Sequence, residues 1–593
     1  MATSIPTFKL DISEGMIDVN TSADRLYGYC IEASKGPVMV PTFCASSKEA
    51  KRIFGVDFLP HFYQNPTGIV ICRVEFDKMA TAKIEYKAKA LKLKAKEEET
   101  DPDVYEISNV EADKFVALTI SSVSPGPCKD RVLIQKSKSG SGYNVSIQID
   151  GVTSKTYQNV PTLEKVANKI NTRFGTYLVA RLSEDYTGNK DKNLKNNKNT
   201  GQKFQRDQFE FPIGENSTAA EIENAGYLTG GSNGVMRNGK GELPENENNY
   251  VSVDTGLLTK PAENAAPTAP NSEMTRAIAY AKAFTKIQDV DLIGIATIVD
   301  SDAVQSQLAL HIDEVTDPEV HQLRFGITGA TGYVLPPNAI LYENGKPNTD
   351  QRPALTEDQQ MTYDILSGQA SILDSEWMIY IGQGVVFEDE YGNRRNVLPH
   401  EATQLYTGLR SALGYSEAIF GGETKKVLKG VVDTLPVVTD GTDIDKELIE
   451  DLNESGVCTF KKEYGEVTFV EGVTTVQDRD VLSYENMMSI VAYVSKRLIR
   501  IAKPYQGQVL TEDLKSTLTT ALIKELKDIT ETDGTLMELE DFNIPPYNVS
   551  VEAGIKTMFD DSNNLIRVSK IIIKCRIVPV GALRDIDLGI IAI

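Results

Sequence analysis

Tryptophan, histidine and cysteine are scarce in this chain of 593 residues, which has one Trp, four His and six Cys. No two histidines are spaced as ligands on one helix, and no two cysteines form a C-x-x-C pair. These absences argue against a metal site and against a disulfide framework. We expect no metal, and free thiols buried in a reducing cytosol. The cysteines are Cys30, Cys44, Cys72, Cys128, Cys458 and Cys575.

Positive charge is also in short supply. The chain has 62 Lys and Arg against 84 Asp and Glu, a formal net charge of −22. Direct nucleic-acid binding needs clustered positive charge that neutralises phosphates, so this balance argues against it. Hydrophobic residues make up 41% and charged residues 25% of the chain, which is typical of globular domains. The length indicates about three or four such units.

Long hydrophobic runs are absent as well. "VDLIGIATIV" (290–299) is one of the longest, and it covers about half of a membrane span. The first residues, "MATSIPTFKLDISEG", contain no basic region followed by an apolar stretch, so no secretory signal is evident. We expect a soluble protein that is made in the cytoplasm and has no stable membrane association.

One glycine-rich stretch comes close to a nucleotide-binding signature. In "GVMRNGKGEL" (234–243), Gly234, Gly239 and Lys240 match the pattern G-x-x-x-x-G-K-[ST], but Gly241 replaces the Mg²⁺-binding hydroxyl. "ELPENENNYV" follows, which is a poor helix start whose carboxylates would repel phosphate. We expect a flexible loop, and we keep nucleotide binding at 234–241 as an alternative.

No other group of residues in the sequence matches a known catalytic motif. His400 and Glu401 begin an H-E-x-x-H pattern, but Gln404 stands at the second histidine position. No G-x-S-x-G motif is present. We expect a protein that is not an enzyme, with no catalytic residues and no cofactor. His311 is expected on a helix face, and the single tryptophan, Trp377, in the core.

Hydrophobic periodicity predicts a mixture of strands and helices. Residues 83–100 alternate Lys with Ala or Leu, which favours a strand with one solvated face, and 188–203 form a polar loop. The run 290–299 suits a buried strand, and Ser301 is a good N-cap for the helix that follows. Further helices are expected at 46–54, 162–175, 273–287, 484–503 and 511–529.

Both ends of the sequence read as strands. Near the start, Phe8, Leu10 and Ile12 alternate with polar residues. "KIIIKCRIVPVGALRDIDLGIIAI" (570–593) contains two strand-like runs, and an apolar strand of this kind is a sticky edge unless something covers it. It can pair within its own subunit, or join a sheet in another subunit. The apolar residues of the second run are Ile586, Leu588, Ile590 and Ile591.

Several short motifs, taken in order, resemble the tail sheath proteins of contractile phage tails and related contractile injection particles. They are "EASKGPVMVPTFCASSKEAKRIFG" (32–55), "GIVICRVEF" (68–76), "YLTGGSNG" (227–234), "VDLIGIATIVDSDAVQSQLALHIDE" (290–314) and "LNESGVCTFKKEYGEVTFVEGVTTVQDRDVLSYENMMSIVAYVSKRL" (452–498). The sequence departs from the family pattern at 83–100, at 235–275 and between 335 and 370.

The resemblance implies a multidomain α/β (α+β) fold. Its α/β core would have a subtilisin-like sheet without a protease site, an inserted β-rich outer domain, and terminal strand arms that exchange between subunits. The implied parts are 1–20, N-terminal arm; 21–80, first part of the core; 81–232, outer domain; 233–275, Gly/Pro/Asn-rich connection; 276–480, core; 481–575, C-terminal helical/β part; and 576–593, C-terminal arm.

The resemblance also implies a function. Subunits would stack as hexameric rings around an inner tail tube and contract to drive the tube through the host envelope, without ATP or a cofactor. Expected partners are further copies of the chain and the tail tube, baseplate and tail terminator proteins. The expected contact residues are the two terminal strands, a core hairpin partner (Val467, Phe469 and Val473) and a domain junction (Gly230, Gly231 and Gly234). A baseplate or capsid component is the other structural alternative.

Overall fold

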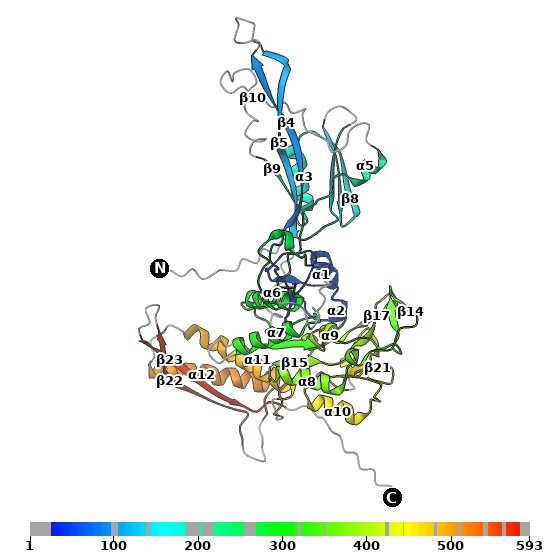
Figure 1. The fold of residues 1–593 in the computed structure, drawn as a ribbon. Helices are drawn as coiled ribbons and strands as arrows, with labels where there is room; N and C mark the ends of the chain where they lie inside the picture. Colours follow the sequence, from blue (N-terminus) through cyan, green and yellow to red (C-terminus); the bar gives the residue numbers. More distant parts are fainter. Residues whose placement is uncertain are drawn as a thin grey trace.

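The computed structural model describes residues 25–95, 105–137, 142–183, 202–203, 218–253, 268–316, 322–348, 350–421, 426–442, 444–478, 483–505, 508, 511–537, 544–559 and 565–580. These residues form a multidomain α+β fold. A central α/β core lies between an outer β-rich module and a C-terminal unit of helices and a hairpin (Figure 1).

A seven-stranded sheet organises the core. All of its neighbouring strands run parallel except β2, which pairs antiparallel with β3 at one edge. Every residue of β1, β3, β12 and β15 is buried, as expected for a parallel sheet covered on both faces. In spatial order the strands are β19 (Val457–Cys458), β15 (Met378–Ile381), β12 (Phe325–Gly329), β11 (Gly294–Ala296), β1 (Tyr27–Ile31), β3 (Ile69–Arg73) and β2 (Thr42–Cys44).

Helices cover both faces of this sheet, and alternate residues of each strand point to opposite sides. In β1, Cys30 belongs to one hydrophobic cluster, whereas Tyr29 and Ile31 belong to the other. The first cluster includes residues of α6 (Ser272–Ile287), α7 (Asp302–Thr316), α8 (Tyr363–Leu373) and α10 (Lys446–Glu454). The second includes residues of α1 (Ser47–Phe54) and α9 (Pro399–Ala412), with α2 (Leu59–Tyr63) packed beside α9.

Local capping explains where several of these helices begin. The Ser46 side chain accepts a hydrogen bond from the Glu49 backbone N–H, and Gly55 ends the helix at φ +80°; only glycine adopts this conformation cheaply. Ser301 accepts from the Val304 N–H in the same way. The predicted helix at 46–54 and the predicted N-cap at Ser301 are therefore confirmed. The predicted buried strand at 290–299 is confirmed as the shorter β11, whose residues are all buried.

Smaller sheets and turns extend from the core. Two hairpins and one three-stranded sheet lie together beside the core, around the labels β14, β17 and β21 in Figure 1. They comprise β13 (Leu341–Glu343) with β14 (Lys346–Asn348), β20 (Phe460–Glu463) with β21 (Glu466–Phe469), and β16 (Val385–Glu388) with β17 (Arg394–Val397) and β18 (Val431–Thr434). Short 3₁₀ turns occur at Glu247–Asn249, Glu357–Gln359 and Lys503–Tyr505.

Two sheets and a helix form the outer module, defined as residues 81–183 with 202–203, which has its own hydrophobic cluster. The prediction of a strand at 83–100 is confirmed as far as residue 95. The predicted loop 188–203 is wrong at its last two residues, which pair with β4. The elements are β10 (Gln202–Lys203), β4 (Thr81–Ala95), β5 (Tyr105–Pro125), β9 (Leu178–Leu182), β6 (Arg131–Lys136), β7 (Tyr143–Ile149), β8 (Val152–Val160) and α3 (Leu163–Phe174); α5 (Ala219–Asn224) follows.

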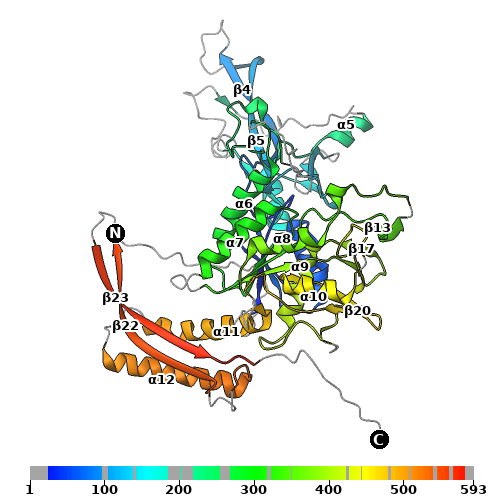
Figure 2. The ribbon, with the colours of Figure 1, turned by 60° about the horizontal axis from the view of Figure 1, so that its bottom comes forward.

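Two long helices and a long hairpin form the C-terminal unit, defined as residues 483–537 with 544–580. The predicted helices are confirmed as α11 (Glu485–Ala502) and α12 (Glu512–Asp528), which is followed by a π turn (Ile529–Asp533). The hairpin of β22 (Tyr547–Phe559) and β23 (Leu565–Ile577) lies against this helix pair (Figures 1 and 2). Among the described residues, no helix is both long and apolar enough to cross a bilayer.

Candidate assembly sites

The predicted terminal strands lie outside the described residues. This applies to Phe8, Leu10 and Ile12 at the start, and to Ile586, Leu588, Ile590 and Ile591 at the end. The family resemblance implies a C-terminal arm at 576–593, but residues 576–577 belong to β23. Residues 578–580 are also bonded into the C-terminal unit, since Val580 N donates to the Thr535 carbonyl at 3.0 Å.

The predicted core hairpin partner occupies the chain's own core. Val467, Phe469 and Val473 are all buried in the cluster that also contains α9. Leu428 N donates to the Val467 carbonyl at 2.9 Å, and Phe420 forms a parallel bridge with Phe469. The outer edge of β21 is thus partly paired within the chain.

The predicted junction glycines lie where the outer module meets the core. Ala80 and Ser232 exchange two backbone hydrogen bonds of 3.0 and 2.9 Å, so the chain enters and leaves the module side by side. A Cβ on Gly231 would lie 2.1 Å from the Gly126 carbonyl oxygen. The close crossing of these two backbones requires glycine at 231, and Gly234 adopts φ +116° beside Asp77. Gly230 also has a positive φ, +78°, but faces open space.

Arg73, at the end of β3, is the central side chain of this junction. It is fully buried, and its Nη1 donates to the carbonyl oxygens of Gly36 at 3.0 Å and Pro125 at 2.9 Å. Its Nη2 donates to Asn233 Oδ1 at 3.4 Å. Burial lowers the pKa of Arg73 to about 10. The guanidinium therefore joins a loop of the core at Gly36, the outer module at Pro125 and the chain that returns to the core at Asn233. No sequence motif indicated this role.

Ion pairs at the surface of the junction reinforce it. Arg237 Nε lies 2.7 Å from Asp77 Oδ2, and both side chains are mostly buried. Lys35 of the core reaches Asp150 of the outer module at 2.8 Å. The Gly36 backbone N–H also donates to Ser124 Oγ at 3.1 Å. These bonds fix the orientation of the module on the core through several independent contacts.

The P-loop-like stretch forms a turn whose backbone N–H groups are hydrogen-bonded within the turn itself. Asn238 Oδ1 accepts from the backbone N–H groups of Lys240 and Glu242, both at 2.9 Å, and Gly241 N donates to the Asn238 carbonyl. The N–H groups that would hold a phosphate are already used inside the turn. Lys240 is exposed, and the first helical element after it is the 3₁₀ turn at 247–249. This geometry does not fit a nucleotide site.

Ligands of open α/β sheets usually bind where the strand order reverses, at the carboxyl ends of the strands. Here that point lies between β1 and β11. Arg276 of α6 fills it by pairing with Glu32 at 2.8 Å, with both side chains 8% exposed. The Asp300 carboxylate accepts from the Gly332 N–H at 2.7 Å. The carboxylates of Glu32 and Asp300 at this point are therefore engaged within the chain.

Histidines and cysteines form no metal cluster among the residues that the structure describes. His61 is fully buried between Tyr29 and α9, with Nδ1 3.0 Å from Thr407 Oγ1. Burial lowers its pKa to about 3, so it is a neutral core residue. His311 is buried on α7, as expected, and Trp377 is half-buried against both core clusters.

Among the described strands, the hairpin of the C-terminal unit has two open edges. β22 pairs only with β23 among the described strands, and beyond the end of β23 there is a single further bridge, Leu536 to Pro579. One face of the hairpin packs on the helices. Its contact residues are Tyr547, Val549, Val551, Ile573 and Ile577.

The helices beneath the hairpin pack as a pair. α11 and α12 contact each other, and β22 packs on α12.

A buried ion pair ties the C-terminal unit to the core. Arg410 Nε of α9 lies 2.9 Å from Glu485 Oε1 at the start of α11, and the two side chains are 2% and 1% exposed. Arg410 also donates to the carbonyl oxygens of Tyr415 and Glu417, and Ser489 Oγ donates to Glu485 at 2.7 Å. Glu485 Oε1 therefore has two partners and the Arg410 guanidinium has three, whereas the buried Oε2 of Glu485 has none among the described residues.

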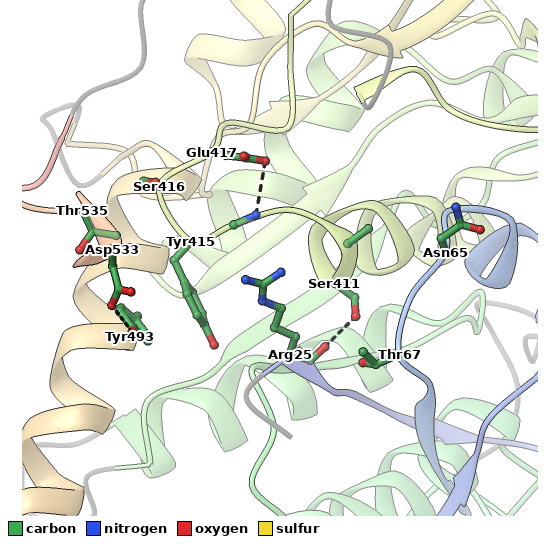
Figure 3. A pocket seen from close by; sticks show the side chains of 12 residues that line it. Arg25, Asn65, Thr67, Ser411, Tyr415, Ser416, Glu417, Tyr493, Asp533 and Thr535 are labelled. Atoms are coloured by element: carbon green, nitrogen blue, oxygen red, sulfur yellow. Dashed lines mark hydrogen bonds between the residues drawn. The ribbon is translucent and has the colours of Figure 1, made fainter. Parts of the chain in front are cut away.

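Beside this ion pair, a cavity of about 650 Å³ opens between the core and the C-terminal unit (Figure 3). Arg25 lies over the ring of Tyr415, which stacks on Tyr493 with centroids 4.2 Å apart. The buried hydroxyl of Thr535 has no hydrogen-bond partner among the described residues. The lining contains no histidine, cysteine or lysine, and its hydroxyl and carboxylate side chains include Thr67, Ser411, Ser416, Glu417, Asp533 and Thr535.

No protein-family model and no curated protein matches the chain. Solved structures do resemble it. The sheath tail protein from Desulfitobacterium hafniense matches 96% of this chain and 100% of its own with a TM-score of 0.51 at 11% identity. The sheath tail protein Lin1278 from Listeria innocua matches 92% and 94% with a TM-score of 0.48 at 10% identity. The sheath of an extracellular contractile injection system in its contracted state matches 54% and 80% with a TM-score of 0.34 at 12% identity. The likeness to the Desulfitobacterium protein shows a shared fold.

Proposed function

We propose that this protein is the structural subunit of a contractile tail sheath and is not an enzyme. Its subunits polymerise as stacked hexameric rings around an inner tail tube. Contraction of the resulting cylinder drives the tube through the host cell envelope. The fold shared with a sheath tail protein supports this proposal, and so do the bonds that engage Glu32 and Asp300 at the point where the strand order reverses.

The observation that carries the proposal is the incomplete sheet of the C-terminal unit. The β22–β23 hairpin leaves both long edges unpaired among the described strands. Open edges of this length attract a further strand. Strands donated by neighbouring copies would extend this sheet, which makes the hairpin a joint between subunits.

The donated strands are the two terminal segments. Phe8, Leu10 and Ile12 mark one of them, and Ile586 and Leu588 mark the other. Each added strand makes about 4–6 backbone hydrogen bonds, each worth roughly 1 kcal/mol net. Repeated around a ring, these bonds keep subunits attached while their cores slide past one another. The edges of the hairpin that are open among the described strands are a better acceptor for them than Val467, Phe469 and Val473, which the core already buries.

The core supplies the rigid body of the machine. Its doubly covered parallel sheet would be the subtilisin-like domain, and it faces the tube. Contraction requires two packings of the same rigid cores with different free energies, so the energy is stored during assembly and no ATP or cofactor is consumed. The Arg73 junction makes the outer module move together with the core.

The partners and location follow from this role. The subunit assembles in the host cytoplasm with further copies, the tail tube protein, and the baseplate and tail terminator proteins. It becomes part of the virion tail, where contraction accompanies genome ejection, and it contacts neither nucleic acid nor membrane stably. A baseplate or capsid component is the competing role. We do not propose nucleotide binding, because the backbone N–H groups of Lys240 and Glu242 are already hydrogen-bonded to Asn238.

Electron microscopy of the overexpressed full-length protein tests the proposal. We expect long hollow cylinders, whereas a variant that ends at Val580 should stay folded and form none. Circular dichroism and thermal unfolding would verify the fold of that variant. Closed shells or compact particles from the full-length protein would favour the competing role, and cylinders from the shortened variant would refute strand donation by the C-terminal segment.

A further inference from the structure

Two different outward surfaces lie at the two edges of the seven-stranded sheet. β19 forms one edge, and α8 and α10 pack against it. β2 forms the other edge, and α1 packs against it. Six strand spacings separate the two edges, a distance of roughly 29 Å. The two surfaces therefore face different neighbours in any assembly of copies.

The α8–α10 face, defined as the outward residues of these two helices, is acidic with an apolar centre. Tyr363 of α8 and Ser455 after α10 join the helices through a 3.0 Å hydrogen bond. Ile365 and Ile372 lie two turns apart on one side of α8 and are 40% and 77% exposed. Residues 445–454, along α10, carry five carboxylates and one lysine.

The α1–β2 face, defined as the outward residues of α1 and the approach to β2, is basic with an apolar residue of its own. Lys48, Lys51 and Arg52 are exposed at helical spacings of three and four. Glu49 accepts from the Ala45 backbone N–H at 3.0 Å and pairs with Arg52 at 3.5 Å, so Lys48 and Lys51 carry the net positive charge of the face. Val40, just before β2, is 52% exposed.

We propose that the α8–α10 face of one copy docks on the α1–β2 face of a second copy. The two faces carry opposite charges. The α8–α10 face also exposes Ile365 and Ile372, and the α1–β2 face exposes Val40. Apolar side chains next to complementary charges are typical of protein–protein interfaces. In a chain with a net charge of −22, copies repel each other unless such local complementarity steers them together.

Contact between two different faces is heterologous, and repeated contacts of this kind close into a ring when the rotation between copies allows it. This inference rests on the proposed function, for which it names a core-to-core contact that is separate from strand donation. It identifies the occupant of both faces as another copy of this chain. A different tail protein on either face is the competing outcome.

Charge reversal tests the contact in the full-length protein. The basic-face variant carries Lys48→Glu with Lys51→Glu, and the acidic-face variant carries Glu447→Lys with Asp451→Lys. A matched control, Lys165→Glu with Arg173→Glu on α3, reverses two exposed charges on the outer module. All six positions are exposed, so circular dichroism and thermal unfolding should match the wild type.

Sedimentation velocity would measure the association at low and high salt. We expect the wild type and the control to associate alike and more weakly at high salt, and each single-face variant to associate about tenfold more weakly. Mixing the two single-face variants should restore association, because every contact then joins opposite charges again. The protein that carries all four reversals should associate like the wild type.

The outcomes separate this inference from the proposed function. The inference fails if both single-face variants assemble as the wild type does, or if neither mixing nor the fourfold reversal restores association. It also fails if the reversals impair only the binding of a separate tail protein. The proposed function fails if the wild type forms no cylinders under the electron microscope, whatever the charge variants do.

Discussion

Arg73 donates from Nη1 to the Pro125 carbonyl oxygen at 2.9 Å, so a side chain at the end of a core strand holds the last residue of the longest strand in the outer module. The same nitrogen also donates to Gly36 of the core. Because a buried guanidinium without these acceptors would be very costly, the module and the core must keep this relative arrangement for Arg73 to stay satisfied.

Replacing Arg73 with methionine should therefore loosen the outer module. The substitution keeps most of the side-chain volume but leaves the buried carbonyls of Gly36 and Pro125 without their donor, which costs about 1–3 kcal/mol for each unsatisfied group. We expect lower thermal stability and faster amide hydrogen exchange at 34–36 and 124–126. An Arg394→Met variant serves as the control, since its ion pair with Glu388 is more exposed and lies outside the junction. Unchanged exchange at both segments in the Arg73 variant would contradict the proposed clamp.

Gly231→Ala should be one of the most damaging small substitutions in the chain. Its Cβ would lie 2.1 Å from the Gly126 carbonyl oxygen, which is backbone and cannot move aside cheaply. We expect a loss of about 2 kcal/mol or more in the free energy of unfolding, measured by denaturant titration. Gly368→Ala, in α8 with open space around it, is the matched control and should stabilise by roughly 0.5–1 kcal/mol. Equal effects at the two positions would show that the tight crossing is unimportant.

Removing the outer module should leave the core folded. Ala80 and Ser232 pair side by side, so a two-residue Asn-Gly turn can join them in place of 81–231. The module buries its own hydrophobic cluster, and the core clusters do not depend on it. We expect a soluble, cooperatively unfolding protein by circular dichroism and calorimetry. Aggregation, or a non-cooperative transition, would mean that the core needs the module to fold.

Acid should destabilise the protein through His61. Its pKa is lowered by burial to about 3, whereas in the unfolded chain it is about 6.5. Below pH 6.5 the His61 side chain is protonated in the unfolded state, but in the folded state it stays neutral down to about pH 3. The free energy of unfolding therefore decreases as the pH is lowered from 6.5 to 3, by up to about 1.4 kcal/mol per pH unit. His61→Gln should be less stable at pH 7, yet lose less stability between pH 6.5 and 4 in denaturant titrations. Parallel pH profiles for the two proteins would contradict this role of His61.

Local patterns in the sequence were sufficient for the helices that were predicted, but not for α8 and α10 or for the contacts between distant segments. Ser301 caps its helix as expected, and Ser46 and Thr511 cap theirs in the same way, because an N-cap acts over three residues. Nothing local indicates that Arg73 reaches Pro125, or that Gly231 crosses Gly126, since these pairs meet only in the folded chain. The two-residue strand β10 was predicted as loop because its pairing with β4, rather than its own composition, makes it a strand.

The buried pair of Arg410 and Glu485 should be the strongest single connection between the core and the C-terminal unit. Glu485→Gln leaves Arg410 charged in a site with almost no solvent access, and breaking a buried pair in this way costs about 3–5 kcal/mol. Arg410→Met alone should cost a similar amount. The double variant should lose much less than the sum, because no uncompensated charge then stays buried. A double-mutant cycle from denaturant titrations gives this coupling. If the two losses simply add, the pair does not hold the C-terminal unit to the core, and the contact between Lys496 and Asp291 would have to carry that role instead.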